Sequence, residues 1–251
     1  MRLVACPFDS EHYGLAIGRL VREAGDGPAE LAAAITAARR ERYAVVFVRL
    51  AGDDPLRGAL AAAGHAPVDT LVTSMLAARS ALPRSPEPAP ELAPELTIEH
   101  HDRLADPADV AAVAAISGEA IRTSHLHADP RLPAERTRAL YAAWATNDVT
   151  GRAQRTIVAR AGRELIGYLA VVATPGTAMI DLVAVAAAWR GRGAGASLLA
   201  GFIDWLGDRA GDPSLVATVG TQADNPALRL YARCGFVPTA THVTYHLWLD
   251  G

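Results

Sequence analysis

A proline-rich run between residues 81 and 95 constrains the fold of this chain more than any other feature of the sequence. The run holds five prolines. Because proline lacks an amide hydrogen and fixes φ, neither a helix nor a central strand can pass through the run. Such a segment is typical of a semi-extended linker. We therefore expect a small N-terminal domain over residues 1–80, a linker over 81–95 and a larger domain over 96–251.

The first part alternates short apolar runs with stretches of helical periodicity. The pattern predicts helices over residues 28–42 and 55–63, and strands over 43–50 and 68–76. Alternation of this kind is typical of α/β structure. The N-terminal domain is therefore predicted to be a small α/β unit.

The second part also mixes strands and helices, and alanine-rich helices come early in it. The predicted helices cover residues 107–121, 134–147, 194–209 and 226–233, and the predicted strands cover 96–101, 156–161, 165–173, 178–186, 215–220, a short run near Phe236, and 243–249. This order favours a mixed sheet flanked by helices.

Composition excludes several classes of function. The formal net charge is -3 and every one of the 24 basic residues is arginine, so the broad positive field of a nucleic-acid-binding protein is missing. The two cysteines have no zinc-type spacing, which predicts no metal site and a reducing compartment. No apolar run approaches the roughly 20 residues of a membrane span. We expect a cytoplasmic protein with a small-molecule substrate, and the sequence leaves a homodimer open.

The segment from Ile180 to Asp208 carries the clearest chemical signal. An apolar strand is followed by Arg190-Gly-Arg-Gly-Ala-Gly195 and then by a helical run. Glycines allow the backbone to turn, so that several amides at the positive end of the helix dipole can point toward one anionic ligand. This arrangement predicts a pyrophosphate cradle, to which Arg190 and Arg192 add charge. A glycine turn without a ligand is the alternative.

Two motifs resemble the GNAT acyltransferase superfamily. Arg190 to Gly195 is similar to its R/Q-x-x-G-x-G/A signature, and Ala227-Leu-Arg-Leu-Tyr-Ala-Arg-Cys-Gly-Phe236 is similar to its A-x-x-x-Y-x-x-x-G-F segment. The resemblance implies a GNAT fold, a splayed mixed sheet, with acetyl-coenzyme A as cosubstrate. It implies that Tyr231 lies near the thioester sulfur. The implied coenzyme-binding residues are Leu182, Val183, Val185, Arg190, Gly191, Arg192, Gly193, Ala194, Gly195 and Asn225, of which Asn225 is displaced by one position from the family pattern.

A narrower resemblance covers more of the chain. The segments 8–19, 124–131 and 220–225 are similar to those of the TDP-fucosamine acetyltransferase group. This implies transfer of an acetyl group to the amine of a nucleotide-linked 4-amino-4,6-dideoxyhexose, with the N-terminal domain on the acceptor side. The residues expected to contact the acceptor are Asp9, Ser10, Tyr13, His125 and Asp129.

Acetyl transfer to an amine requires a base for the amine and a proton for the leaving thiolate. Tyr231 is the expected acid, unless it is only a packing residue of its helix. His127 is the expected base, with His125, Asp129 and Glu119 as alternatives. The acceptor stays open between an amino sugar, a protein N-terminus, an amino acid and an aminoglycoside. A non-catalytic coenzyme-binding module is the remaining alternative.

Overall fold

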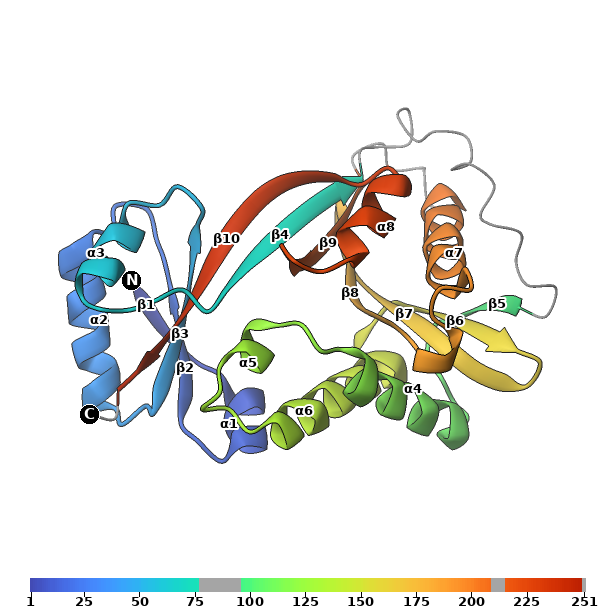
Figure 1. Cartoon of the computed structure of the whole chain (residues 1–251), viewed down its shortest axis with the longest axis horizontal. Helices are drawn as coiled ribbons and strands as arrows, with labels where there is room; N and C mark the ends of the chain where they lie inside the picture. The colour runs from blue at the N-terminus through green and yellow to red at the C-terminus, as the bar shows by residue number, and fades with distance from the viewer. Residues whose placement is uncertain (77–95, 209–214, 250–251) are drawn as a thin grey trace. The chain divides into compact units, whose positions relative to one another are not determined.

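The computed structural model (Figure 1) describes residues 1–76, 96–208 and 215–249, which form a mixture of strands and helices. The linker predicted over 81–95 lies outside the described residues. Packing divides the chain into two units. Unit 1 comprises Met1–Val72, Thr123–Thr137 and Ala240–Gly251, and unit 2 comprises Thr73–Arg122 and Arg138–Thr239.

Unit 1 is built on strands in the order β1-β2-β3-β10-β4. β2 and β3 are parallel, whereas β1 and β10 are antiparallel to their neighbours β2 and β3. A parallel pair requires a crossover, and α2 supplies it. The elements are β1 (Arg2–Ala5), α1 (Pro7–Tyr13), β2 (Ile17–Val21), α2 (Pro28–Arg40), β3 (Val45–Ala51), α3 (Leu56–Ala62), the start of β4 (Asp69–Leu76), α5 (His125–Ala128) and most of β10 (Val237–Trp248).

The core of unit 1 lies on one face of this sheet, which α2 and α3 cover (Figure 1). Alternate residues of β3 and β10, among them Val48 and Leu247, point into that core. Because side chains alternate along a strand, Phe47 and His246 lie on the opposite face. They face each other in the register of the two strands. The opposite face therefore carries aromatic and titratable side chains.

Unit 2 contains strands in the order β4-β9-β8-β7-β6-β5. β5 to β8 form an antiparallel meander, and β9 is parallel to β8. The elements are β5 (Leu96–His101), α4 (Pro107–Ala120), most of α6 (Ala134–Asn147), the π-helical turn η2 (Asp148–Arg152), β6 (Arg155–Ala161), β7 (Glu164–Thr174), β8 (Thr177–Val185), the 3-10 turn η3 (Ala187–Trp189), α7 (Ala194–Asp208), β9 (Val216–Gln222) and α8 (Ala227–Arg233).

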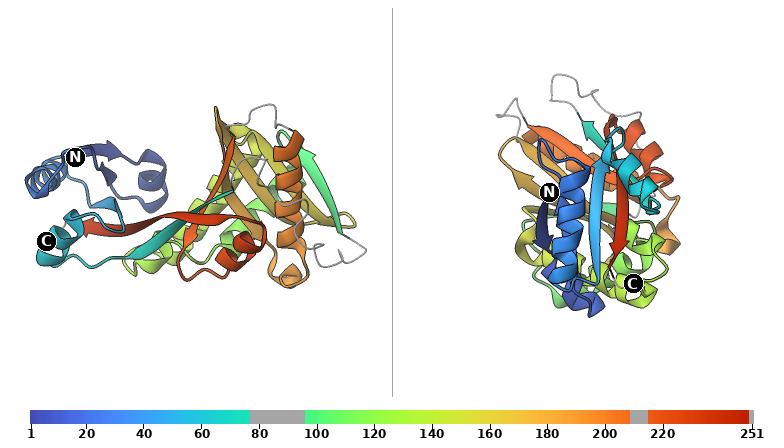
Figure 2. Two further views of the ribbon diagram at one scale, coloured as in Figure 1. Left: turned by 90° about the horizontal axis from the view of Figure 1, so that it is seen from above. Right: turned by 90° about the vertical axis from the view of Figure 1, so that its left-hand side faces the viewer.

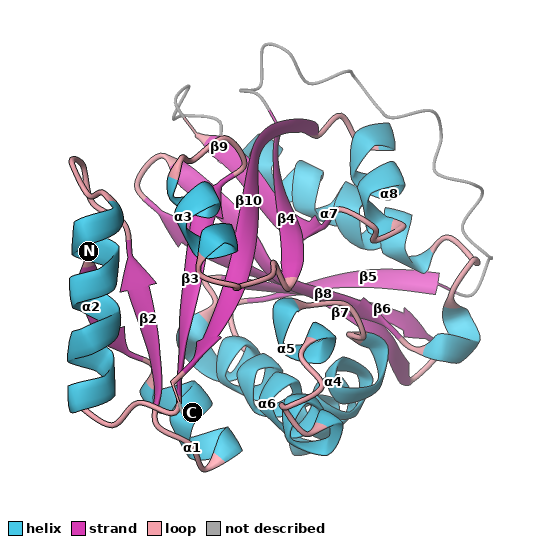
Figure 3. Cartoon of the chain, turned by 60° about the vertical axis from the view of Figure 1, so that its left-hand side comes forward, coloured by secondary structure: helices cyan, strands magenta, loops and turns pink. Residues whose placement is uncertain are grey.

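Helices cover both faces of the sheet of unit 2 (Figure 3). α7 stands along one face (Figure 2), where Leu198 and Phe202 pack against Leu169 of β7. The neighbouring residue Tyr168 points to the other face, where its hydroxyl is hydrogen-bonded to the Ser117 hydroxyl of α4. The result is a sheet enclosed between α4 and α7.

The predicted mixed sheet flanked by helices is confirmed, and the helices and strands predicted after residue 27 are found. Two details differ. The two last strands expected near Phe236 and over 243–249 are the single strand β10, and the sequence pattern missed α1, α5, β1 and β2, which are all short. The packing units also differ from the predicted domains, because residues 240–248 pair with β3 and residues 123–137 pack in unit 1.

Candidate functional site

The parallel strands β8 and β9 pair over only part of their length. Their register runs from Thr177 opposite Val216 to Ile180 opposite Val219, and β8 then continues to Val185 without this partner. A bulge in the pairing with β7 falls at the same point, between the pairs made by Leu182 and Ile180. The splay predicted at the end of β8 is therefore present, and it begins at the bulge.

The backbone of β8 presents polar groups on the side that β9 leaves. The amide of Ala186 donates to Ile166 of β7 at 2.8 Å. In an antiparallel pair, residues with hydrogen bonds to the partner alternate with residues whose N–H and C=O point away. Val185 and Val183 are of the second kind, since they lie one and three residues before Ala186. Their amides and the carbonyl of Val183 are placed to pair with an extended ligand in the manner of another strand, whereas the carbonyl of Val185 accepts from Arg190.

The loop that follows β8 has the glycine-dependent geometry that its sequence predicts. Gly191 and Gly193 have φ of 74° and 86°, which disfavours any residue with a Cβ. The Ser197 amide donates to the Gly193 carbonyl at 3.0 Å, so that Gly193 caps α7. The amides of the first turn of a helix have no partner within the helix. Ala194 and Gly195 therefore present donors at the positive end of the α7 dipole.

The two arginines of this loop differ in their contacts. The Arg190 guanidinium donates to the carbonyls of Val185 at 3.2 Å and Ala120 at 3.4 Å, which ties the loop to β8 and to the end of α4. Arg192 is exposed and lies 5.3 Å from the centre of the Trp189 ring. Arg190 thus fastens the loop, whereas Arg192 is the arginine whose charge is directed to solvent.

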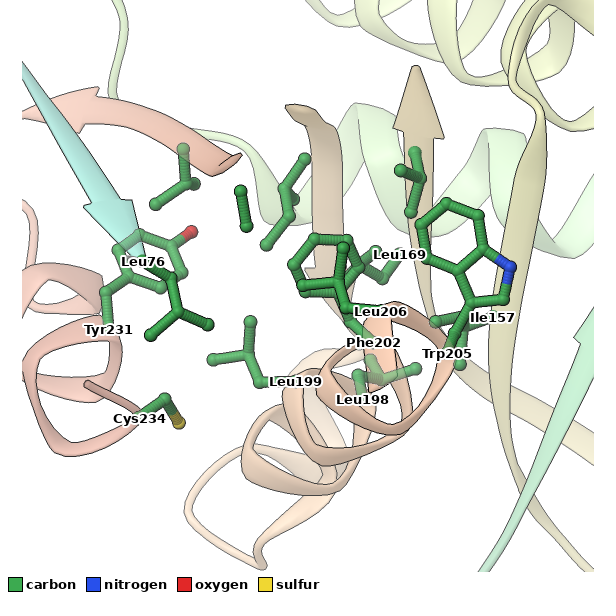
Figure 4. Packing of buried hydrophobic residues seen from close by; sticks show 14 of the residues in the cluster. Leu76, Ile157, Leu169, Leu198, Leu199, Phe202, Trp205, Leu206, Tyr231 and Cys234 are labelled. Carbon is green, nitrogen blue, oxygen red and sulfur yellow. The ribbon is translucent and has the colours of Figure 1, made fainter. Parts of the chain in front are cut away.

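Tyr231 lies on α8 in the core of unit 2, 4% exposed, beside Leu76 and Cys234 (Figure 4). Its hydroxyl is at the end of the ring that faces away from Cys234. Burial, with a smaller contribution from the Cys234 thiol, raises the pKa of Tyr231 to about 12. The hydroxyl consequently keeps its proton at neutral pH, and the ring also has the packing role that the alternative interpretation gives it.

The Asn225 side chain is hydrogen-bonded at the start of α8. Its Oδ1 accepts from the amide of Ala227 at 2.9 Å. A carboxamide in this position caps the helix. The displacement of Asn225 from the family pattern thus coincides with a capping role.

All the residues expected on the acceptor side lie in unit 1, and several are held by internal hydrogen bonds. The Ser10 hydroxyl donates to Cys6 at 2.7 Å and accepts from the Ile17 amide at 3.0 Å. The Tyr13 hydroxyl is bonded to the Thr137 hydroxyl at 2.7 Å. Asp9 is half-buried, and burial raises its pKa. Ser10 and Tyr13 therefore position α1 and β2.

A chain of hydrogen bonds joins three titratable side chains of unit 1. His246 Nδ1 is 2.7 Å from Asp129 Oδ2, and His246 Nε2 is 2.8 Å from His125 Nδ1. Trp248 Nε1 also donates to Asp129 Oδ2, at 2.8 Å. Burial raises the pKa of Asp129, but the hydrogen bonds from Trp248, the Arg131 amide and His246 outweigh it and hold that pKa below its usual value. Asp129 is therefore ionised and can only accept.

The ionised carboxylate fixes the tautomers along this chain. His246 must carry its hydrogen on Nδ1, so its Nε2 accepts from Nδ1–H of His125, and His125 Nε2 is left with a lone pair. Burial, followed by the charge of His246, lowers the pKa of His125 well below its usual value. The lowered pKa keeps His125 neutral at pH 7, with its Nδ1–H donated to His246 and a lone pair on Nε2.

His127, the base that the sequence favours, lies outside this chain. Its Nδ1 is bonded to the Ser124 hydroxyl at 2.8 Å, at the start of the short helix α5. The sequence analysis missed His246 and Trp248, which come from β10. The available signal was alternation, because Val243, Tyr245 and Leu247 form an apolar series and the residues between them share the opposite face.

Unit 2 contains a second titratable cluster, close to the bulge of β8. Trp144 Nε1 donates to Asp181 Oδ2 at 2.8 Å, and Arg152 bridges Asp181 and Asp148. Asp148 is fully buried. Burial and the neighbouring Asp181 raise the pKa of Asp148 to about 7.

Residues 1–76, 96–208 and 215–249 contain neither a candidate membrane span nor a candidate metal site. None of their helices combines the length and apolar character needed to span a membrane. None of their His, Cys, Asp and Glu side chains form a group of three or more placed to hold a metal ion.

A sheet enclosed by helices, a splayed parallel pair and a glycine loop at a helix start define the GNAT fold, and comparisons support this. Residues 118–236 match the model of the Acetyltransferase (GNAT) family. A tandem GNAT protein from the clavulanic acid biosynthesis pathway is similar over 95% of this chain and 77% of its own, with a TM-score of 0.65 and 19% identity. A GCN5-related N-acetyltransferase from Sphaerobacter thermophilus also has a TM-score of 0.65, with 16% identity over 99% of this chain and 76% of its own.

Among curated proteins, the chain is similar to the spore coat polysaccharide biosynthesis protein SpsD of Bacillus subtilis (strain 168). The two are 31% identical over 144 residues, which cover 57% of this chain. The chain thus spans about half the length of this curated relative, since the match covers 49% of SpsD.

Proposed function

We propose that this protein transfers the acetyl group of acetyl-coenzyme A directly to the amine of a nucleotide-linked amino sugar, of the TDP-4-amino-4,6-dideoxyhexose class. The splay of β8 from β9 beside the glycine loop is the observation that carries the coenzyme assignment. The name of the relative SpsD, which refers to polysaccharide biosynthesis, supports a sugar acceptor.

The coenzyme is assigned to the end of β8 and the start of α7. The amides of Gly193, Ala194 and Gly195 face the pyrophosphate, and Arg192 supplies charge from the loop rim. The backbone of Val183 and Val185 pairs with the extended arm of the coenzyme, beside Leu182. Acetyl-coenzyme A supplies an acyl thioester, which an amine can attack without a covalent enzyme intermediate.

Tyr231 is assigned to the sulfur atom that leaves as the coenzyme A thiolate. A thiol has a pKa of about 8.5, lower than the raised pKa of the Tyr231 hydroxyl, about 12. The hydroxyl therefore stabilises the thiolate mainly as a hydrogen-bond donor. Hydrogen bonds to charged groups are worth about 1.5–3 kcal/mol.

His125 takes the proton of the acceptor amine, and His246 and Asp129 position it. This assignment replaces His127 as the favoured base, because the lone pair on His125 Nε2 is fixed by the bonds from His125 through His246 to Asp129. Asp9 remains assigned to acceptor contact. Ser10 and Tyr13 support the acceptor side by holding α1 in place.

The test measures release of the coenzyme A thiol in the presence of TDP-4-amino sugars. We expect release that depends on the sugar and a product heavier by one acetyl group in mass spectrometry. Simple amino acids, aminoglycosides and a peptide with a free N-terminus are the comparison acceptors. Faster turnover with any of these would overturn the sugar assignment, and no turnover with any amine would overturn the enzymatic one.

A further inference from the structure

The N-terminal unit contains a loop that matches the coenzyme loop of unit 2. Arg22-Glu-Ala-Gly25-Asp-Gly27 follows β2, and Arg190-Gly-Arg-Gly-Ala-Gly195 follows β8, with arginine and the last two glycines at the same spacing. Gly25 and Gly193 have φ of 87° and 86°. In each case a helix of more than twelve residues follows, α2 or α7. The two loops therefore share a sequence pattern and the positive φ of one glycine, although α2 begins after Gly27 and α7 begins before Gly195.

The elements after the two loops also correspond. β3 and β9 have seven residues each, and so do α3 and α8. Each of these elements in the second series begins and ends 171 residues after its counterpart in the first. β3 covers 45–51 and β9 covers 216–222, while α3 covers 56–62 and α8 covers 227–233. The strand before each loop is parallel to the strand after the helix. Each series ends in a long strand, β4 or β10.

The helix starts match in their hydrogen bonds as well. Asp54 Oδ1 accepts from the Leu56 amide at 2.9 Å, and Asn225 Oδ1 accepts from the Ala227 amide at 2.9 Å. A proline follows each capping residue. A general α/β crossover requires neither this cap nor this proline, so the match goes beyond a shared fold type.

The helix ends match in the same way. Gly64 and Gly235 have φ of 82° and 88° at the same distance after α3 and α8. The amide of the residue after each glycine closes the turn by donating to a residue inside the helix. These bonds are His65 to Leu60 at 2.9 Å and Phe236 to Tyr231 at 3.0 Å.

The first loop differs because carboxylates of its own segment occupy its amides. Asp26 Oδ2 accepts from the Glu23 amide at 2.6 Å, and Glu30 Oε2 accepts from the Gly27 amide at 2.8 Å. Two negative charges thus lie against the donors that a phosphate would require. The second loop has no acidic residue between 190 and 196.

The strands and the helix of the first unit also lack the features that the coenzyme requires. β2 pairs with β3 from Ile17 to Leu20 and ends at Val21, so it has no long stretch without a partner. β8 continues for five residues, Asp181–Val185, beyond its last pair with β9. Leu60 stands in α3 where Tyr231 stands in α8, so the hydroxyl is missing as well.

We propose that residues 17–76 and 177–248 are two copies of one structural module, and that only the second copy retains a coenzyme site. The first copy keeps the backbone framework, but its loop is closed by Asp26 and Glu30. The chain accordingly binds one coenzyme A, through the second copy. This inference rests on the proposed function for the identity of the ligand.

The experiment counts coenzyme A bound per full-length chain by calorimetry and native mass spectrometry, in the wild type and in two matched variants. Gly25→Asp and Gly193→Asp introduce the same side chain at nearly the same φ, so their structural cost is comparable. We expect one coenzyme A in the wild type and in Gly25→Asp. We expect affinity lower by about 100-fold or more in Gly193→Asp, because a carboxylate meets the pyrophosphate.

Two bound coenzyme molecules in the wild type would overturn the inference, and so would loss of binding in Gly25→Asp together with retention in Gly193→Asp. No binding by a folded wild type would overturn the proposed function and the coenzyme assignment with it. Circular dichroism of both variants establishes that they are folded. The wild-type count stands without either variant.

Discussion

The two loops at 22–27 and 190–195 have the same spacing of arginine and glycines but different residues around their amides. Both have a glycine at φ near 87° and both lead into a helix. In the first, Asp26 and Glu30 bind the loop amides, whereas the second has only neutral and basic residues there. Backbone conformation provides the donors, but the neighbouring side chains decide whether a ligand can use them.

The two units also differ in their other polar groups. Unit 2 has the open backbone of β8 and the hydroxyl of Tyr231, while unit 1 has the hydrogen-bonded chain of Asp129, His246 and His125. In the proposed function, the coenzyme is assigned to unit 2 and the base for the acceptor amine is assigned to unit 1. Substitutions in the two units should therefore change different kinetic quantities.

The largest effect is expected from His125→Gln in unit 1. Loss of a general base typically lowers a rate by about 10²–10⁴-fold, so kcat should fall in that range while the affinity for acetyl-coenzyme A stays unchanged. Steady-state kinetics and calorimetry measure the two quantities. His127→Gln is the matched control and should retain most of its kcat. A normal kcat in His125→Gln would remove this residue from the mechanism.

Tyr231→Phe tests the hydroxyl that distinguishes α8 from α3. The ring and its packing are kept, so the melting temperature and coenzyme affinity should change little. We expect kcat to fall by about 10- to 100-fold, the worth of one hydrogen bond to a charged group. Leu60→Met, at the corresponding position of unit 1, should leave kcat unchanged. A lower melting temperature with normal kcat would instead assign Tyr231 to packing alone.

Arg192→Ala makes the second loop resemble the first, which has Ala24 at the same position. We expect acetyl-coenzyme A to bind about 10-fold more weakly, because one charge-assisted contact with phosphate is lost. The effect should shrink at high salt, since the Arg192 side chain is exposed. Affinity measured at two ionic strengths checks both points. Equal affinities of variant and wild type at low salt would contradict the loop assignment.

The smallest effect concerns Asp148, a buried residue of unit 2. Its pKa is raised to about 7 in the folded protein, mainly by burial. The folded state therefore holds a proton that the unfolded state has released, and stability from this group falls as pH rises from about 4 towards 7. Asparagine at this position stays neutral at every pH. The melting temperature of Asp148→Asn should therefore rise relative to that of the wild type as the pH increases from 5 to 8.

Melting curves across this pH range measure the difference. Asp204→Asn, an exposed position on α7, is the control and should follow the wild type at each pH. A constant difference between Asp148→Asn and the wild type would show that Asp148 is ionised throughout.

Much of the coenzyme half could be predicted because its signals are local in the chain. The glycines at 191 and 193, the helix after them and the strand before them lie within about thirty residues, and each acts through backbone geometry that its own residue type dictates. The role of Arg190 could not be predicted. Its partners include the carbonyl of Ala120, which only the packing of α4 brings near.

The residues assigned to the acceptor could be predicted only in part. The segment 124–131 indicated His125 and Asp129 as candidates, but these two side chains are connected through His246, which is 117 residues from Asp129 in the chain. The alternation in β10 places His246 on the face opposite Val243 and Leu247, but it does not show which side chains that face meets. Pairing of β10 with β3 places it beside Phe47 and under α5.

The sequence by itself therefore determined the order of strands and helices, the glycine loop and its helix, since hydrophobic period and residue conformation act over a few positions. Tertiary structure decided that His246 connects His125 to Asp129, and it decided that residues 123–137 and 240–249 pack with the N-terminal unit. These outcomes depend on strand pairing and on desolvation of charges, and both are set by segments far apart in the chain.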